Sequence, residues 1–137
     1  MYKEIYIFPA IITKLGKNDY NISFPNFEYI ISYGENLENA YIMAEDALSL
    51  ELFDLWDDKK EIPEAIDVDS LDLENNQTLI LVKLSLKDIL KKYDDKAVKK
   101  TLTIPSWLNK IAEENKVNFS QILKTGLMEH LNINEKR

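Results

Sequence analysis

The chain of 137 residues contains no cysteine, a single histidine and only three glycines. Without cysteine it has no disulfide and no thiolate metal site, so a reducing cytoplasm is the expected location. His130 has no second histidine to join it, so we expect it at the surface or in an interface rather than at a metal or catalytic site. The glycines at positions 16, 34 and 126 are too scattered for a phosphate-binding loop. No apolar run approaches the length of a membrane span, and we expect no signal peptide.

The two halves of the chain carry opposite net charge, because basic residues are scarce in the first half and outnumber acidic ones in the second. Residues 1–76 contain 5 basic residues against 17 acidic ones, whereas residues 77–137 contain 12 basic against 7 acidic. The formal charge of the whole chain is −7. This asymmetry predicts two parts that meet different partners, although an acidic solubilising surface with an incidental basic end would give the same counts.

Three strands are predicted at the start of the chain. The segment 4–14 is β-branched and aromatic on both faces, which is typical of a strand covered on both sides. Polar residues around Gly16 predict a hairpin turn, and residues 20–24 then alternate as a second strand. Residues 29–34 predict a third strand that ends at Gly34.

The pattern then changes to a helical period. Asn36 is the predicted N-cap of a helix with one apolar face: Leu37, Ala40, Ala44, Ala47, Leu48, Leu52 and Leu55. An acidic connection follows at 57–77, then a strand at 78–84 and a short helix at 85–93. The order βββαβα predicts a small α+β domain over residues 1–93, with one sheet and a helix on its face.

A linker at 94–97 precedes a basic module at 98–137, in which we predict one strand and two helices. The strand covers 98–104, and the helices run from about Pro105 to 115 and from about Ser120 to 131. Proline suits a first helical position, and the Ser120 hydroxyl suits the N-cap of the second helix.

About forty residues with one strand and two helices cannot bury their apolar faces alone, and a lone strand lacks a ladder partner. Both problems are solved if two copies pair their strands antiparallel and interlock their helices. A homodimer is therefore predicted, with this core: Leu102, Ile104, Leu108, Ile111, Ile122, Leu123 and Leu127.

The other face of the predicted strand carries Lys99, Thr101 and Thr103. A two-stranded ribbon fits the DNA major groove, where hydroxyls can bond base edges and lysine can contact guanine or phosphate. The helix start near Ser120 would offer backbone N–H groups to a phosphate. DNA is thus a predicted partner.

At this point the chain resembles a known family. "VKKTLTIPSWLNKIAEENKVNFSQILKTGLMEHL" resembles the ribbon-helix-helix DNA-binding module, and "TLTIPSWL" followed by "NFSQIL" is similar to the C-terminal domain of HicB-type antitoxins. "YIFPAIITK", "YNISFPNF" and "GENLENAYIMAEDAL" resemble the first domain of that family, a truncated RNase H-like fold.

The resemblance implies a type II antitoxin that masks a small HicA-type ribonuclease with its first domain and represses its own operon. It implies no cofactor, no metal, no membrane and no enzymatic activity, and a dimer that can assemble into a tetramer. Lys99, Thr101, Thr103 and Ser120 would then be the DNA-binding residues. The weakly indicated toxin contacts are these: Phe24, Asn26, Phe27, Glu38 and Glu45.

Two other functions are compatible with a first domain of this kind. A ribbon-helix-helix regulator could carry a ligand-sensing domain in place of a toxin-binding one. A metal-dependent RNase H-like nuclease would need carboxylates converging from neighbouring strands. The predicted strands carry none after Glu4, so the nuclease is the weaker alternative.

Overall fold

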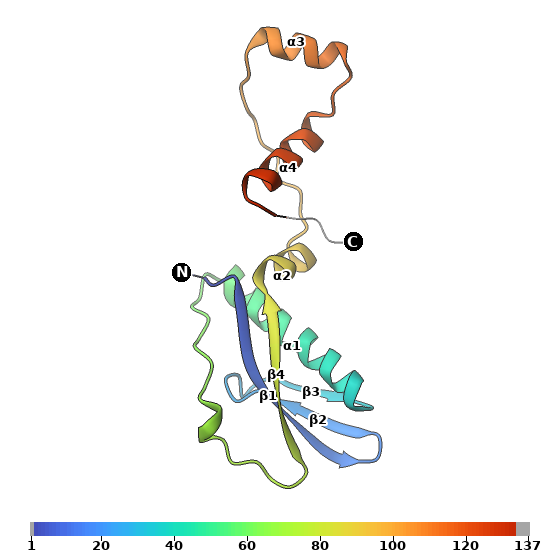
Figure 1. The fold of residues 1–137 in the computed structure, drawn as a ribbon, viewed down its shortest axis with the longest axis vertical. Helices are drawn as coiled ribbons and strands as arrows, with labels where there is room; N and C mark the ends of the chain where they lie inside the picture. The colour runs from blue at the N-terminus through green and yellow to red at the C-terminus, as the bar shows by residue number, and fades with distance from the viewer. Residues whose placement is uncertain (1, 134–137) are drawn as a thin grey trace. The chain divides into compact units, whose positions relative to one another are not determined.

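The computed structural model describes residues 2–133, which form two compact units, the first ending at Ala97 and the second beginning at Val98 (Figure 1). The order of elements is βββαβα in the first unit and two helices in the second, apart from a short 3-10 helix. The mixed α+β class predicted from the sequence is confirmed. Among the residues described, no helix combines the length and apolarity that a membrane crossing requires.

A four-stranded antiparallel sheet forms one layer of the first unit. Its strands are β1 (Ile5–Gly16), β2 (Asp19–Ser23), β3 (Ile31–Gly34) and β4 (Gln77–Ser85). They lie in the order β3-β2-β1-β4, so β1 is central and β4 is an edge strand. The isoleucines, valine and aromatic residues of these segments suit strands that pack on one side.

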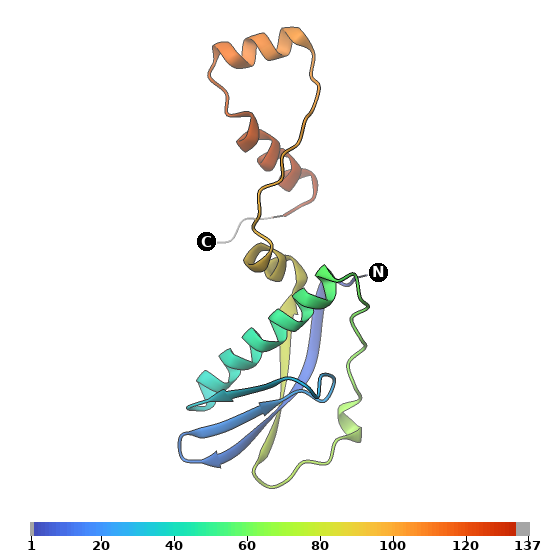
Figure 2. The same cartoon turned by 180° about the vertical axis from the view of Figure 1, so that it is seen from behind.

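Helix α1 (Leu37–Asp57) lies against one face of this sheet (Figure 2). The predicted cap is confirmed, because the side-chain oxygen of Asn36 accepts a hydrogen bond of 2.8 Å from the Asn39 N–H. The residues that α1 buries lie along one side of the helix: Ala40, Ala44, Leu48, Ser49 and Leu52. The helix approaches β3 so closely that a Cβ at Gly34 would lie 2.6 Å from the Cα of Ala40, which explains a glycine there.

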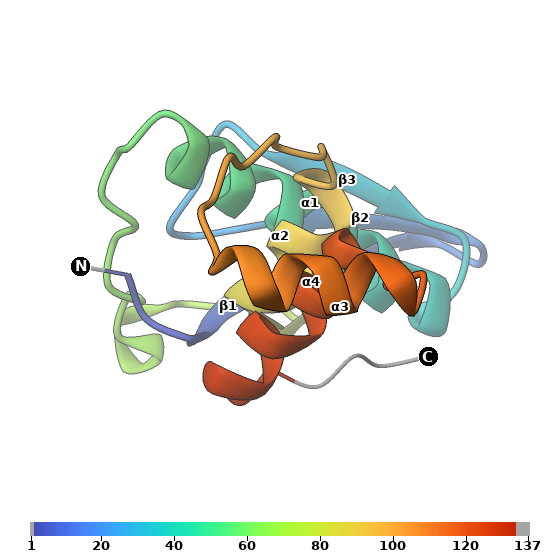
Figure 3. The same ribbon diagram turned by 90° about the horizontal axis from the view of Figure 1, so that it is seen from above.

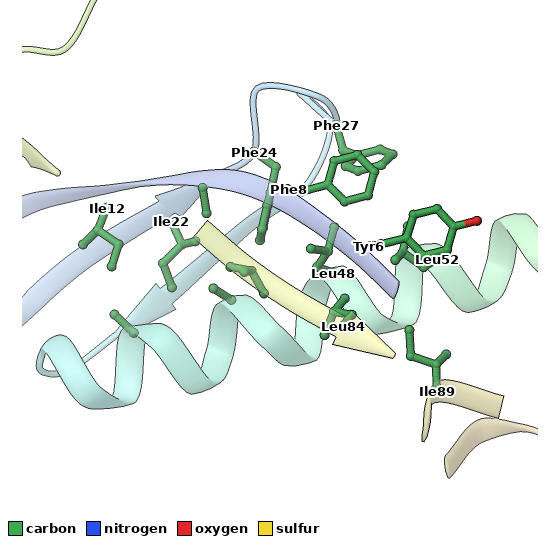
Figure 4. Packing of buried hydrophobic residues seen from close by; sticks show 14 of the residues in the cluster. Tyr6, Phe8, Ile12, Ile22, Phe24, Phe27, Leu48, Leu52, Leu84 and Ile89 are labelled. Carbon is green, nitrogen blue, oxygen red and sulfur yellow. The ribbon is translucent and has the colours of Figure 1, made fainter. Parts of the chain in front are cut away.

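The core of the first unit lies between α1 and the inner face of the sheet (Figure 4). Phe8 of β1 packs edge-on against Phe27, with ring centroids 5.2 Å apart. Helix α2 (Leu86–Tyr93), capped by Ser85, adds Leu86 and Ile89 to the same core. The buried side chains that point inward from β1 thus all belong to this core.

The other side of the sheet, which we call the outer sheet face, corrects one prediction. β1 was predicted to be covered on both sides, but Ile7 is exposed there. Cross-strand pairing places further side chains on this face, because directly opposed residues point the same way. Its exposed large members are these: Ile5, Ile7, Ile31, Tyr33 and Leu81. The prediction failed because a strand that is apolar on both faces need not have a second layer within its own chain.

The acidic connection between α1 and β4 contains one 3-10 helix, η1 (Val68–Ser70). Asn26 holds this connection in place from the loop after β2. Its amide donates a hydrogen bond of 2.8 Å to the Glu64 carbonyl, and its side-chain oxygen accepts one of 3.1 Å from the Ile66 N–H.

The second unit consists of α3 (Ser106–Glu114) and α4 (Phe119–His130), joined by a short turn (Figure 3). Pro105, predicted as the first helical residue, is the N-cap of α3, so the helix begins one position later than predicted. Residues 98–104 have no strand assignment, so the predicted strand is not formed within a single chain. A strand is defined by its ladder partner, and none of the described residues supplies one.

Candidate nucleic-acid and partner interfaces

The basic segment 98–104 keeps the alternation that the sequence predicted. Lys100, Leu102 and Ile104 line a hollow of about 420 Å³ in the second unit. Lys99, Thr101 and Thr103 do not line this hollow, and they are exposed. The polar side chains predicted to read DNA are therefore accessible, and they alternate with side chains that line the hollow.

The hollow brings together residues that are distant in the sequence. Besides the basic segment, it is lined by Asn109 of α3 and by four residues of α4: Phe119, Ser120, Ile122 and Leu123. Four of the predicted dimer-core residues thus meet at one place: Leu102, Ile104, Ile122 and Leu123. Their shared hollow is open and largely apolar.

No residue of the second unit is buried within the described part of the chain. Leu102 is 62% exposed, Ile122 58% and Leu127 52%. The other predicted core residues are also exposed: Ile104, Leu108, Ile111 and Leu123. Two large side chains that sequence reasoning did not assign to this surface, Trp107 and Phe119, join them. Trp107 lies at the start of α3, directly after Pro105 and Ser106. Its position in the sequence alone therefore did not show whether the side chain faces the core or the surface.

The start of α4 differs from the prediction. Asn118 is the N-cap, and its side-chain oxygen accepts a hydrogen bond of 3.1 Å from the Gln121 N–H. Ser120 is the second residue of the helix and does not cap it. Asparagine is at least as good a cap as serine, and the helix begins at the earlier of the two possible positions. The first-turn N–H group of Ser120 has no intrahelical acceptor, as in any helix.

The solvent face of α1 is the acidic surface of the first unit. The helix contains six acidic residues and no basic one: Glu38, Glu45, Asp46, Glu51, Asp54 and Asp57. Between them three apolar side chains are exposed: Ile42, Met43 and Leu50. Lys92 of α2 offsets part of this charge, since its Nζ lies 3.5 Å from a carboxylate oxygen of Asp46. A helix that exposes both carboxylates and apolar side chains suits a basic protein partner.

The weak candidates for toxin contacts divide into three groups. Phe24 and Phe27 are 1% and 3% exposed, so they are core residues and not contacts. Asn26 is engaged in holding the connection. Glu38 is exposed at the start of α1, and Glu45 is half-buried and lines a cavity of about 190 Å³ with Lys92. The acidic candidates are therefore accessible, and the aromatic ones are not.

Tyr29 marks the edge of the acidic surface. Its hydroxyl donates a hydrogen bond to a carboxylate oxygen of Glu51. Desolvation, this hydrogen bond and the negative charges of Glu51 and Asp54 raise the pKa of Tyr29 to about 12. The tyrosine therefore stays protonated and ties the loop before β3 to α1.

Within residues 2–133, no group of three or more histidine, aspartate or glutamate side chains is arranged to hold a metal ion. Most acidic residues of the first unit are spread along α1 and the connection, as the sequence indicated.

Comparison with known proteins shows which family and which solved structures the chain resembles. The family model described as HicB-like antitoxin of bacterial toxin-antitoxin system matches residues 8–127. A chain from a structure described as a toxin-antitoxin complex from Streptococcus pneumoniae has 26% sequence identity and a TM-score of 0.60. The alignment covers 92% of this chain and 99% of that one.

The antitoxin HicB of Burkholderia pseudomallei has 19% identity and a TM-score of 0.54, with 92% of this chain and 96% of that chain covered. This second similarity concerns the fold alone. No functionally curated protein matches the chain. Because the family model spans both units, from β1 to the last turn of α4, the chain belongs to the HicB-like antitoxin family of bacterial toxin–antitoxin systems.

Proposed function

We propose that this antitoxin works through two surfaces. Its first unit binds and masks a small HicA-type, mRNA-cleaving toxin, and its second unit pairs with a second copy to bind operator DNA and repress the shared operon. Family membership and the similarity to a chain from a toxin–antitoxin complex support the toxin-binding role. The role is that of a regulator rather than an enzyme.

One observation carries the DNA-binding half: none of the described residues of the second unit is buried. Helices that hold their apolar side chains only partly covered are not stable in water without a partner. Antiparallel pairing of segment 98–104 between two copies would supply the missing ladder. It would also cover the open hollow lined by Leu102, Ile104 and Ile122. The result is a ribbon-helix-helix dimer.

In such a dimer the two copies of Lys99, Thr101 and Thr103 would lie side by side on the exposed face of the ribbon. Hydroxyls there can bond base edges in the major groove, and lysine can contact guanine or phosphate. The free N–H groups in the first turn of α4, including that of Ser120, would face a DNA phosphate. The second unit carries 7 basic and 4 acidic residues in 98–137, which favours this approach.

The DNA surface is tested with matched substitutions in one segment. Thr101→Ala with Thr103→Ala should weaken binding to operator DNA more than to random DNA. Lys99→Gln should lower the slope of log K against log salt by about 1 if the lysine contacts a phosphate. Lys100→Gln is the control, because Lys100 lines the hollow. Equal losses on both DNAs from the threonine substitutions would refute a role in reading sequence.

The toxin surface that we propose is the solvent face of α1. A ribonuclease that binds RNA carries a basic surface, and six carboxylates on one helix would attract and orient it. The exposed Ile42, Met43 and Leu50 would supply the apolar contact between the charges.

Two measurements test this surface. Asp54→Lys with Asp57→Lys should slow association with the toxin by about tenfold at low salt, since electrostatic steering acts mainly on the on-rate. Asp72→Lys, in the acidic connection, is the control. A chain ending at residue 95 should still bind toxin, though with lower avidity. If that shortened chain folds but captures no toxin, the proposed division of roles is wrong.

A further inference from the structure

A cavity of about 190 Å³ lies in the first unit, between α1, the end of β4 and α2. Glu45 and Ser49 line it from α1, one helical turn apart. Asp88 of α2 and its N-cap Ser85 line it from the other helix. Residues with two carboxylates and two hydroxyls, drawn from two helices, therefore border one small cavity.

Ser49 is the unusual member of this set. It is only 9% exposed, and its hydroxyl forms no hydrogen bond with any of residues 2–133. A buried hydroxyl without a partner lowers stability, because it has given up its bonds to water. Since Ser49 lines the cavity, a group that enters the cavity could supply the missing hydrogen bond.

The carboxylates of Glu45 and Asp88 also have no partner among the described residues. The ion pairs of the first unit join other side chains. The Ser85 hydroxyl oxygen accepts a hydrogen bond of 3.4 Å from the Asp88 N–H, so it is the backbone of Asp88 that is bonded and not its carboxylate. What the cavity offers is thus mostly acceptor oxygens, which require a donor with positive charge.

Two lysines line the cavity, but their charges are directed elsewhere. The Nζ of Lys92 lies 3.5 Å from a carboxylate oxygen of Asp46 and 5.2 Å from the centre of the Tyr93 ring, and neither of these residues lines the cavity. Lys83 is paired across the sheet with Ile7, which is exposed on the outer sheet face. Because directly opposed residues point the same way, the Lys83 side chain starts on the face that α1 does not cover.

The size of the cavity limits what it can hold. Pockets for small-molecule ligands usually measure roughly 300–1,000 Å³. A cavity of about 190 Å³ is smaller and suits the end of a single side chain. Leu84 and Ile89 form the apolar part of its wall, and both belong to the core (Figure 4). Such a wall can cover the face of a planar group.

We propose that this cavity is an anchor pocket for one arginine side chain of the basic toxin, an inference that rests on the proposed function of the first unit. A guanidinium group has five N–H donors in one plane and no acceptor. It would donate to the carboxylates of Glu45 and Asp88 and to the hydroxyl oxygen of Ser49. A lysine ammonium lacks this planar fork and could not reach both helices in the same way.

The pocket is continuous with the surface proposed for the toxin. Ile42, an exposed apolar residue of α1, precedes Glu45 by three positions and is therefore its neighbour on the helix surface. Arginine side chains in pockets are among the residues that dominate protein interfaces, while the contacts around them contribute less. The carboxylates further along α1 would attract the toxin, and this pocket would hold it.

The pocket itself is tested without the toxin. N-acetyl-arginine methylamide is titrated into the full-length protein, and amide NMR spectra are recorded. The signals of Ser49, Ser85 and Asp88 should shift. The citrulline analogue has nearly the same shape without the charge, and it should shift none of them. In Glu45→Gln, which keeps the shape of the side chain, the shifts caused by the arginine compound should disappear.

The role in toxin binding is tested by kinetics at a salt concentration that screens long-range attraction. Glu45→Gln should raise the rate of toxin dissociation about tenfold or more and leave the association rate nearly unchanged, as expected for a contact and not for steering. Asp88→Asn should act in the same direction. Glu74→Gln, in the acidic connection, removes the same charge far from the cavity lining and should change neither rate.

The outcomes separate this proposal from the proposed function. If the wild-type chain binds no toxin, the toxin-binding function fails, and the titration then decides whether the cavity accepts a guanidinium group. If toxin binds but Glu45→Gln dissociates no faster than Glu74→Gln, the anchor pocket is refuted while the function stands. Equal shifts from the arginine and citrulline compounds would likewise overturn the proposal.

Discussion

Helices α1 and α4 carry leucine pairs at the same four-residue spacing, yet the two pairs have different surroundings. Leu48 and Leu52 of α1 are completely buried against the sheet, while Leu123 and Leu127 of α4 are 37% and 52% exposed. The apolar pattern is similar, but only the first unit contains a layer to cover it. An amphipathic helix thus specifies that a partner is needed, and the rest of the chain decides whether that partner is internal.

The largest effect is expected in the core that two copies would share in the proposed dimer. Leu102→Ala should destabilise the second unit by about 2–5 kcal/mol for each chain, because each copy loses a buried leucine in the proposed dimer. Circular dichroism at several protein concentrations should show loss of helix together with loss of dimer. Thr101→Ala, on the other face of the same segment, should leave the dimer intact. If Leu102→Ala changes neither quantity, the second unit folds alone.

A similar truncation in the first unit should act at constant oligomeric state. Leu48→Ala should lower the free energy of unfolding of this unit by about 2–5 kcal/mol, since Leu48 is fully buried against the sheet. Leu50→Ala, in the same helix but 48% exposed, is the control and should have a much smaller effect. Urea unfolding monitored by tryptophan fluorescence measures both, and equal effects would contradict the assignment of the core.

The cap of α4 offers a smaller test within the second unit. Asn118→Ala removes the oxygen that accepts from the Gln121 N–H and should cost about 1 kcal/mol. Ser120→Ala removes no capping bond and should change stability by about 0.5 kcal/mol or less. Thermal unfolding of the dimer compares them, and a larger loss from Ser120→Ala would restore the cap predicted from the sequence.

The smallest effect concerns pH and the first unit alone. The pKa of Tyr29 is raised to about 12 from an ordinary value near 10, so the folded state holds the phenol proton more tightly. The contribution of Tyr29 to stability is therefore complete below pH 10 and is lost as the pH rises towards 12. Tyr29→Phe should remove one phenol that titrates near pH 12 from the absorbance at 295 nm. A Tyr29 that titrates near 10 would show that its bond to Glu51 does not persist.

Local patterns determined what could be predicted. The cap at Asn36 and the strand and helix around Ser85 depend on neighbouring residues, and the structure has them where expected. The strand predicted at 98–104 is not formed, since none of the described residues supplies a ladder partner for it. The choice between Asn118 and Ser120 as a cap required the helix axis, which sequence periodicity places only within a few residues. Phe24 and Phe27 were only weak candidates for toxin contacts, because loop aromatics give no period that separates core from surface, and the structure buries both.

None of the described residues of the second unit is buried, and this would make the proposed repression depend on the amount of antitoxin in the cell. If these helices fold only in pairs, the share of folded operator-binding units rises with the abundance of the chain, and dilution unfolds them by mass action. A cell that makes little antitoxin would leave its promoter open, and one that makes much would close it, with no separate sensor needed.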